Sequence, residues 1–163
     1  MLEALRERGF SVVEEPGRRI VREELASNGS ALPWIDLAAF ARRAISAAAS
    51  DWEANAKSDS WVFFDRSLVD AASALEHASG DRVLDDLGRT HPYHRCVFLT
   101  PPWPEIYGQD EERQHDIEAA AEEYDRLLAA YRMLGYEITI LPKASVAERA
   151  DLILRTLEAD VPR

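Results

Sequence analysis

The sequence predicts an α/β protein in which a mostly parallel β-sheet is covered by helices on both faces. Short apolar segments recur along the chain, and the intervals between them have the residue spacing of amphipathic helices. The predicted strands are apolar throughout instead of alternating apolar with polar residues, which is typical of parallel sheets that are buried on both sides. These observations indicate a continuous alternation of strands and helices.

Four short segments have the composition of buried strands. They are rich in aliphatic and aromatic residues, and they span Phe10 to Glu14, Trp61 to Asp65, Arg95 to Leu99 and Tyr136 to Leu141. We therefore expect these four strands to form the sheet.

Two long helices are predicted between the strands. Apolar residues with helical spacing run from Leu37 to Trp52 after a capping Asp36, and again from Ile117 to Leu134. Gly135 is placed to end the second of these helices, because glycine adopts the left-handed backbone that commonly terminates a helix.

Three further helices are indicated by their first residues. Pro16 and Ser67 are both favourable at a helix start, and we expect helices over roughly Pro16 to Ser27 and Leu68 to Ala78. The last helix opens with Ser145 and Glu148 at the spacing of a capping box, in which each side chain binds a backbone N–H of the first turn.

The beginning of the chain departs from this alternation. Leu2 and Leu5 lie on one side of a helix that ends at Gly9, and this helix leads directly into a strand. In a doubly wound sheet such a helix normally follows an earlier strand. We therefore expect an earlier strand that this sequence does not contain.

Length, composition and charge restrict the class of protein. The 163 residues and 47% hydrophobic content predict one domain over residues 1–163. The single cysteine and the lack of a signal-peptide pattern favour a cytoplasmic protein, and no apolar stretch approaches the ~18–20 residues that span a bilayer. The formal net charge of -11 argues against a nucleic-acid partner, because such affinity comes mainly from Lys and Arg. The oligomeric state is left open.

Four strings in fixed order carry a family resemblance over nearly the whole chain. They are LEALRERGFSVVEEPGRRIVREEL, WVFFDRSLVDA, VFLTPPWPEIYGQDEERQ and GYEITILPKASVAERAD. Together they resemble the predicted-ATPase branch of the AAA-domain proteins, which are P-loop NTPases of the kinase-like type. The resemblance implies ATP and Mg²⁺ as cofactors, a small-molecule acceptor as partner, and ATPase or phosphotransferase activity.

The sequence departs from this family in one respect. In the family a first strand and a glycine-rich loop ending in Gly-Lys-Ser/Thr precede the helix that begins like LEALRERGF, but Met1 stands at this junction and no G-x-x-x-x-G-K-[ST] string occurs in the sequence. That loop holds the phosphates and Mg²⁺. We therefore expect a fold truncated at its N-terminus, with the phosphate-binding loop upstream of Met1 and the chain alone inactive. With the kinase strand order, the strands at Trp61 and Arg95 would then be neighbours across a gap.

Asp65 and Arg66 end a predicted strand, where an open α/β sheet presents its ligand site. By the resemblance, Asp65 would orient Mg²⁺ through water or accept the proton of an attacking hydroxyl, and Arg66 would pair with a phosphate or carboxylate. The alternative is that Asp65 caps the next helix together with Ser67 and that Arg66 forms an ordinary ion pair.

Glu14, Glu15 and Arg18 follow another predicted strand and are expected at the same edge of the sheet. They are candidates for substrate binding, since a carboxylate accepts hydrogen bonds from sugar or amine groups and an arginine binds an anion through two donors. The alternative is a pair of acids favoured by the helix dipole, followed by a solvated arginine.

Two further segments are predicted to reach the nucleotide. The string TPPWPEIYGQDEERQ has three prolines and a glycine before a long helix, which indicates a lid with a hinge. Arg113, at the start of that helix, is expected to contact the transferring phosphate. The alternative is an i,i+3 or i,i+4 pair with Asp110, Gln109 or Asp116 on an exposed helix. Pro142 and Lys143 resemble the loop beside the nucleotide base, and a plain turn between strand and helix is the alternative.

A second class of function remains open at this point. The chain could be a non-catalytic regulatory module that binds an anionic metabolite or a protein partner, since a few arginines in one place can make a local positive field in an acidic molecule. Under this hypothesis the arginines bind an anion without nucleotide turnover.

Overall fold

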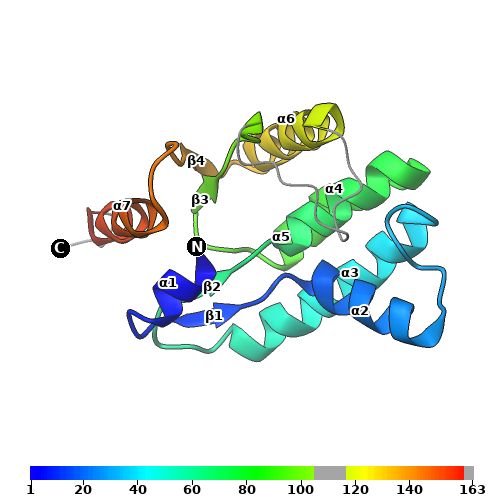
Figure 1. The fold of residues 1–163 in the computed structure, drawn as a ribbon, viewed down its shortest axis with the longest axis horizontal. Helices are drawn as coiled ribbons and strands as arrows, with labels where there is room; N and C mark the ends of the chain where they lie inside the picture. The colour runs from blue at the N-terminus through cyan, green and yellow to red at the C-terminus, as the bar shows by residue number, and fades with distance from the viewer. Residues whose placement is uncertain (105–116, 160–163) are drawn as a thin grey trace. The chain divides into compact units, whose positions relative to one another are not determined.

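The structure is a computed structural model that describes residues 1–104 and 117–159. Its helices and strands are shown in Figure 1, and in chain order they are α1 (Leu2–Arg6), β1 (Ser11–Val13), α2 (Pro16–Ser27), α3 (Leu37–Asn55), β2 (Val62–Phe64), α4 (Leu68–Ser79), α5 (Leu84–Thr90), β3 (Cys96–Leu99), α6 (Ile117–Met133), β4 (Glu137–Ile140) and α7 (Val146–Ala159). The predicted α/β class is confirmed by this mixture of helices and short parallel strands.

The chain divides into two compact units. The β1–β2 unit comprises Gly9–Tyr93 together with Leu2, and the β3–β4 unit comprises Met1, Glu3–Arg8 and His94–Arg163. The prediction of one domain over residues 1–163 stays a prediction.

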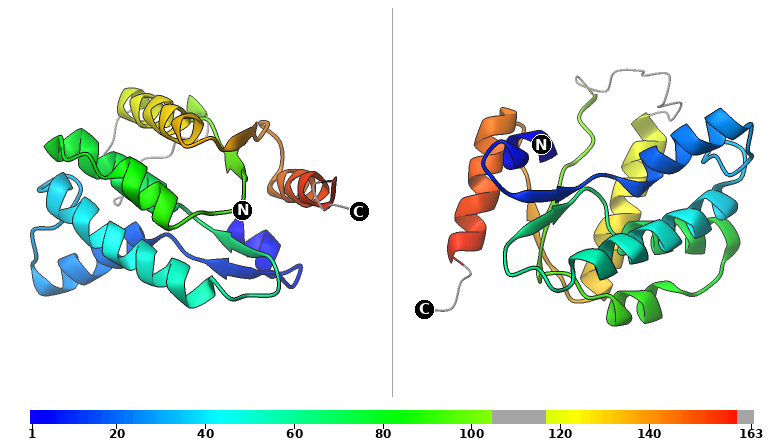
Figure 2. Two further views of the ribbon diagram at one scale, coloured as in Figure 1. Left: turned by 180° about the vertical axis from the view of Figure 1, so that it is seen from behind. Right: turned by 90° about the horizontal axis from the view of Figure 1, so that it is seen from below.

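Each unit contains one parallel pair of strands. In the β1–β2 unit, Ser11 lies opposite Val62 and Val13 opposite Phe64, and both views in Figure 2 show these two strands side by side. In the β3–β4 unit, Cys96 lies opposite Glu137 and the pairing continues to the ends of both strands. Among the described residues, β2 pairs with β1 and β3 pairs with β4, so the segments at Trp61 and Arg95 do not pair with each other.

The strands are shorter than the apolar segments that predict them. The observed strands begin one residue after Phe10, Trp61, Arg95 and Tyr136, where the predicted segments begin. Composition reports which residues suit a buried sheet, and it does not report where hydrogen bonding between the strands stops.

The helix starts follow local chemistry. Asp36 accepts a hydrogen bond from the Ala39 N–H at 2.9 Å at the start of α3, as predicted. The short helix α5 was not predicted, because its first N–H groups are bound by a distant side chain: the Glu76 carboxylate accepts hydrogen bonds from Val83 and Leu84 at 2.8 and 2.9 Å. The residues around Leu84 contain no sequence pattern that predicts this contact.

Helix α3 packs mainly on α4 and α2 and forms the core of the β1–β2 unit with them. Ile20, Ala44 and Ala71 are buried at its centre, with Phe40 and Ile45 packed against them. Alanines on the facing sides let the helix backbones approach closely. Burying one large aliphatic side chain stabilises the fold by about 1.5–3 kcal/mol.

In the β3–β4 unit, α1 is attached to α7 through Arg8. The Arg8 guanidinium pairs with Asp151 at 2.8 Å and donates a hydrogen bond to the Ala147 carbonyl oxygen at 3.2 Å. Ile153 and Leu157 on α7 are buried, as is Tyr131 on α6. The first helix therefore belongs with the C-terminal part of the chain.

None of the described helices combines the length and the apolar character that a membrane-spanning helix needs.

Candidate functional site

The parallel pairing of β1 and β2 brings two charged segments to the same edge of their sheet. The Asp65 N–H donates a hydrogen bond to the Val13 carbonyl oxygen at 2.9 Å, so the ladder continues one residue beyond β2. Glu14 follows Val13 directly, and Arg66 follows Asp65. The two segments leave the sheet at the carboxyl ends of adjacent strands, which is the edge where open α/β sheets bind ligands.

Glu15 and Arg18 contact each other at the start of α2. The Arg18 Nε lies 3.1 Å from Glu15 Oε2, and the Glu15 side chain is 28% exposed. A Cβ atom at Gly17 would lie 3.2 Å from Glu15 Oε1 and 3.1 Å from the ring of Phe40, so the missing side chain leaves room for both. A larger side chain at residue 17 would therefore crowd both the Glu15 carboxylate and the Phe40 ring.

Arg66 has an unusual backbone conformation. Its φ of 68° lies in the left-handed region, which costs a residue with a side chain about 1–3 kcal/mol. Nη1 of the guanidinium pairs with Asp70 Oδ1 at 3.2 Å. The alternative of an ordinary ion pair for Arg66 is thus realised in its geometry, and the anion-binding role stays a prediction.

Ser67 begins α4, and its partner in the capping box is Asp70, not Asp65. Asp70 Oδ2 accepts hydrogen bonds from Ser67 N–H at 2.9 Å and from Ser67 Oγ at 3.0 Å, while Ser67 Oγ accepts one from the Val69 N–H at 3.0 Å. The alternative in which Asp65 caps this helix with Ser67 is therefore wrong. Asp65 itself is exposed at the end of the strand.

Asp70 was missed as a residue of this edge. The sequence does contain a signal for it, because Ser67 and Asp70 have the S-x-x-D spacing of a capping box. The spacing predicts the contact with Ser67, but the contact with Arg66 depends on the left-handed backbone at residue 66, which the spacing does not indicate.

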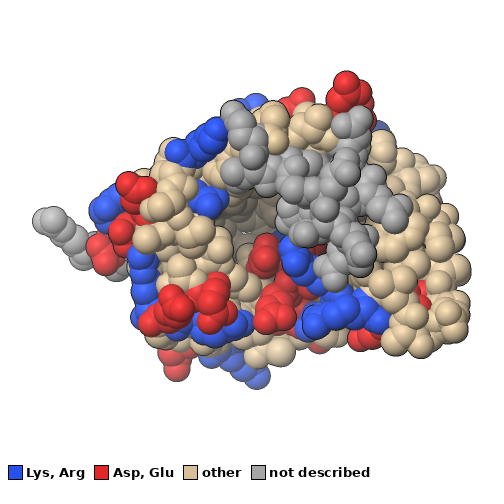
Figure 3. All heavy atoms as spheres, viewed as in Figure 1, with Lys and Arg blue, Asp and Glu red and all other residues tan. Residues whose placement is uncertain are grey.

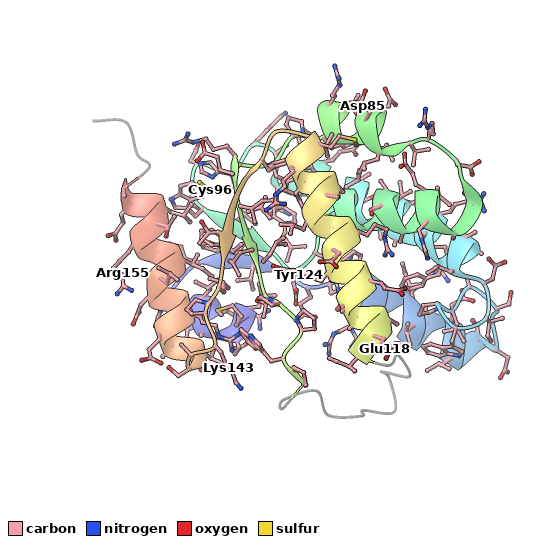
Figure 4. The ribbon with its side chains drawn as sticks, turned by 90° about the horizontal axis from the view of Figure 1, so that it is seen from above. Asp85, Cys96, Glu118, Tyr124, Lys143 and Arg155 are labelled. Carbon is pink, nitrogen blue, oxygen red and sulfur yellow. The ribbon has the colours of Figure 1, made fainter. Side chains whose placement is uncertain are left out.

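Pro142 and Lys143 lie between β4 and α7 in the β3–β4 unit, and Lys143 is labelled in Figure 4. The ladder continues to the Leu141 N–H, which donates to the Leu99 carbonyl oxygen at 2.8 Å, and the Ala144 N–H then donates to the Pro142 carbonyl oxygen at 2.9 Å. This geometry is a tight turn between strand and helix, and the nucleotide contact predicted for it is not tested.

The turn leads into the predicted capping box of α7. Glu148 Oε2 accepts hydrogen bonds from Ser145 N–H at 2.9 Å and from Ser145 Oγ at 2.7 Å, and the Glu148 N–H donates to Ser145 Oγ at 3.2 Å. The hydrogen bonds from the Ser145 side chain and backbone lower the pKa of Glu148. The capping prediction is confirmed.

Arg113, the predicted phosphate contact, and its alternative partners Asp110 and Asp116 lie outside the described residues. Trp103, near the end of the described part of this segment, lies against Arg149 of α7, with the guanidinium carbon 5.1 Å from the ring centre. In such a cation–π contact the face of the aromatic ring attracts the positive charge of the guanidinium.

His94 and its neighbours precede β3. Partial burial, and then the positive charge of Arg95, lower the pKa of His94, while Glu137 opposes the shift. The Cys96 N–H donates to His94 Nδ1 at 3.3 Å, and Arg95 pairs with Glu137 at 2.7 Å. The neutral imidazole is therefore favoured in the folded protein.

In the described residues, no three side chains of His, Cys, Asp or Glu are grouped as the ligands of a metal ion. Mg²⁺ keeps several waters and is usually held by one or two carboxylates together with substrate phosphates. Asp65 has an exposed carboxylate, and its predicted contact with Mg²⁺ through water stays a prediction.

A groove of about 560 Å³ runs between α2 and α3. Its arginines are paired with carboxylates: Arg19 with Asp51, Arg42 with Asp81 at 3.0 Å, and Arg43 with Glu23 at 2.6 Å. Figure 3 likewise shows acidic and basic side chains interspersed on the face in view. The positive charges of the groove are thus balanced by carboxylates. They do not make the groove a stronger candidate for anion binding than the edge at β1 and β2.

The comparison with known proteins gives one match. The sequence model of the AAA-domain family matches residues 1–149. No curated protein and no solved structure matches the chain. Because the match covers most of the chain and agrees with its helices and parallel strands, the chain belongs to the AAA-domain family, and is a nucleotide-binding protein of the P-loop NTPase kind.

Proposed function

We propose that the protein is an ATP-dependent NTPase or kinase-like phosphotransferase in which the edge at β1 and β2 binds a small acceptor. The observation that supports this proposal is the parallel register of β1 and β2, which brings the residues that follow the two strands, Glu14 and Asp65, to the same edge of the sheet. Carboxylates can accept hydrogen bonds from hydroxyl or amine groups, and guanidinium groups bind phosphate or carboxylate. Both kinds of group are needed where a phosphoryl acceptor is held.

Under this proposal the triphosphate is bound by a glycine-rich loop, and the given sequence contains no such loop. Such a loop follows a strand, and the kinase-like strand order places that strand against β2. β2 pairs through one edge with β1 among the described strands, and a further parallel strand on its other edge is compatible with this pairing. The 163-residue chain on its own is then expected to bind ATP poorly and to have no activity.

Each candidate residue has a role under this proposal. Asp65 contacts Mg²⁺ through water or takes the proton of the acceptor hydroxyl, and Arg66 and Arg18 bind an anionic group of the acceptor. Arg113 stabilises the transferring phosphate, and the turn at Lys143 passes the base. Catalysis would consist mainly of positioning and charge neutralisation.

The test compares two forms of the chain by isothermal titration with ATP and Mg²⁺. One form has the 163 residues, and the other is extended by the in-frame coding sequence upstream of Met1. We expect ATP binding by the extended form and little or none by the short form. Within the extended form, replacing the loop Lys by Ala should remove binding, since that side chain contacts the phosphates.

Two results would contradict the proposal. A stop codon directly upstream of Met1 would leave no phosphate-binding loop, and tight ATP binding by the short form would show that the loop is not required. In an active extended form, Asp65→Asn should lower turnover by about 10²-fold, in the range of general acid–base contributions. Asp85→Asn, at the exposed start of α5, is the matched control and should leave turnover unchanged.

The regulatory alternative makes a different prediction in the same experiment. If the extended form binds ATP but shows no turnover with any acceptor, and if Asp65→Asn leaves ATP binding unchanged, then a non-catalytic module is favoured. The arginines at the β1–β2 edge would in that case serve anion binding alone.

A further inference from the structure

One carboxylate organises the segment that follows β2. Asp70 uses Oδ2 to accept two hydrogen bonds from Ser67, and it uses Oδ1 to pair with the Arg66 guanidinium. Its side chain is only 13% exposed. The same group therefore caps α4 and pairs with the Arg66 guanidinium.

A helix cap does not by itself require the contact with Arg66. In a capping box the acidic residue binds the backbone N–H of the N-cap residue, which here is Ser67. The second oxygen of Asp70, Oδ1, accepts a hydrogen bond from the Arg66 guanidinium at 3.2 Å, and the backbone of residue 66 is left-handed. An energetically unfavourable backbone and an ion pair thus act on the same side chain.

We propose that Asp70 is a positioning residue, which orients the Arg66 guanidinium at the carboxyl end of β2 to bind an oxyanion group of the acceptor. The inference rests on the proposed function, in which Arg66 binds the acceptor. A guanidinium has five N–H donors in a planar fork, so a pairing through Nη1 is compatible with a second anion. The class of ligand is a phosphate or carboxylate group.

Position and charge have opposite effects in this arrangement, and this permits a sharp test. As a mere charge, Asp70 repels an anion near Arg66, so a variant that keeps the charge should bind the anion unchanged. As a positioning group, Asp70 must keep its oxygens in place, so Asp70→Glu should weaken binding although the charge is kept. A longer side chain moves the carboxylate by one methylene group.

The experiment titrates the 163-residue chain with inorganic phosphate and, in a second arm, with acetate at equal ionic strength. Binding is followed by the NMR shifts of the Ser67 backbone amide and of the Arg66 Nε–H. We expect Arg66→Ala to remove binding and Asp70→Glu to weaken it about fivefold, within the range of couplings between residues of one network.

Asp85→Glu is the matched control, because Asp85 also lies in the first turn of a helix and pairs with an arginine four residues away. It should leave the dissociation constant unchanged. Asp70→Asn supplies a second variant if Asp70→Glu does not fold, since its amide oxygen can still bind Ser67. We expect weaker binding and a lower heteronuclear NOE at Arg66 Nε, which a purely structural cap would not alter.

The outcomes separate the two claims. If Arg66→Ala leaves binding of both anions intact, the assigned role of Arg66 in the proposed function is wrong. If Arg66→Ala removes binding but Asp70→Glu does not weaken it, only the positioning role of Asp70 is overturned. Tighter anion binding by Asp70→Asn than by the original chain also overturns it.

Discussion

The phenol oxygen of Tyr93 accepts a hydrogen bond from the backbone N–H of Leu68 at 3.2 Å. Leu68 is the first residue of α4, and the first N–H groups of a helix have no partner within the helix. Because Leu68 is 0% exposed, water does not readily replace the phenol. The ring of Tyr93 also packs edge-on against Phe64 of β2, with the ring centres 5.3 Å apart. Tyr93, the last residue of the β1–β2 unit in the chain, thus contacts the residues on both sides of the Asp65 segment.

Tyr93→Phe should lower the free energy of unfolding by about 1–3 kcal/mol, the cost of a buried donor left without its acceptor. The ring contact with Phe64 is kept, so the loss reports the hydroxyl. Unfolding in urea gives the value. Tyr124→Phe, at a half-buried tyrosine of α6, is the control, and an equal loss in both variants would contradict the assignment.

Glu24 should matter far more for stability than its neighbour Glu23, although both pair with Arg43. Glu24 is 8% exposed and also accepts a hydrogen bond from the Ala31 N–H at 2.7 Å. We expect Glu24→Gln to cost about 1–3 kcal/mol, because buried groups lose partners, and Glu23→Gln to cost about 0–1 kcal/mol as an exposed pair. Thermal and urea unfolding of the two variants decide this.

Gly29→Ala provides a second test of the same contact. A Cβ atom at residue 29 would lie 2.0 Å from Glu24 Oε2, so the carboxylate has to move. Because both substitutions disturb one contact, the double variant with Glu24→Gln should lose less stability than the sum of the single losses. Additive losses would show that the two positions act independently.

Ser145→Ala should raise the pKa of Glu148 toward its ordinary value, since the hydrogen bonds from Ser145 are what lower it. A carboxyl whose pKa is lower in the folded protein favours folding above its unfolded pKa, and this contribution is lost as the pH falls through the lowered value. NMR titration of the Glu148 carboxyl carbon measures the shift. Ser58→Ala, in the β1–β2 unit, should leave this pKa unchanged.

The lowered pKa of His94 predicts a loss of stability on mild acidification. Burial and Arg95 disfavour the charged imidazole, so the unfolded chain takes up the proton first as the pH falls through the ordinary histidine pKa of about 6.5. Stability is therefore fully present above that pH and decreases below it. His94→Gln should show a smaller decrease than the original chain in urea unfolding between about pH 8 and about pH 5.5. His77→Gln is the control, and an equal decrease in all three would contradict the prediction.

The sequence predicts the elements whose limits depend on local chemistry. Pro16 begins α2 and Asp36 caps α3 as expected. Gly135, with its φ of 82°, lies in the turn that follows the end of α6 at Met133. The α/β class and the edge that joins Glu15 to Asp65 follow from apolar strands and from the parallel pairing they favour. The limits of these helices are encoded by residues close together in the chain.

The sequence does not predict contacts that depend on distant parts of the chain. Glu76 starts α5 from eight residues away, and Tyr93 binds the start of α4 across 25 residues. The pairing of Asp70 with Arg66 is local in sequence, but it depends on a left-handed backbone that most arginines do not adopt. Residue type and spacing do not report such a conformation.

The two-stranded sheets determine which parts of each unit open first. A two-stranded β-ribbon is at best marginally stable in water, so the strands rely on the helices packed around them. Local opening then begins where few buried contacts are lost, and the slowest hydrogen exchange is confined to well-packed elements. In the β1–β2 unit we expect amides of α3 and α4 to exchange with solvent more slowly than those of Val12 and Phe63. The sheet edge that carries Asp65 would then open locally while α3 and α4 remain folded.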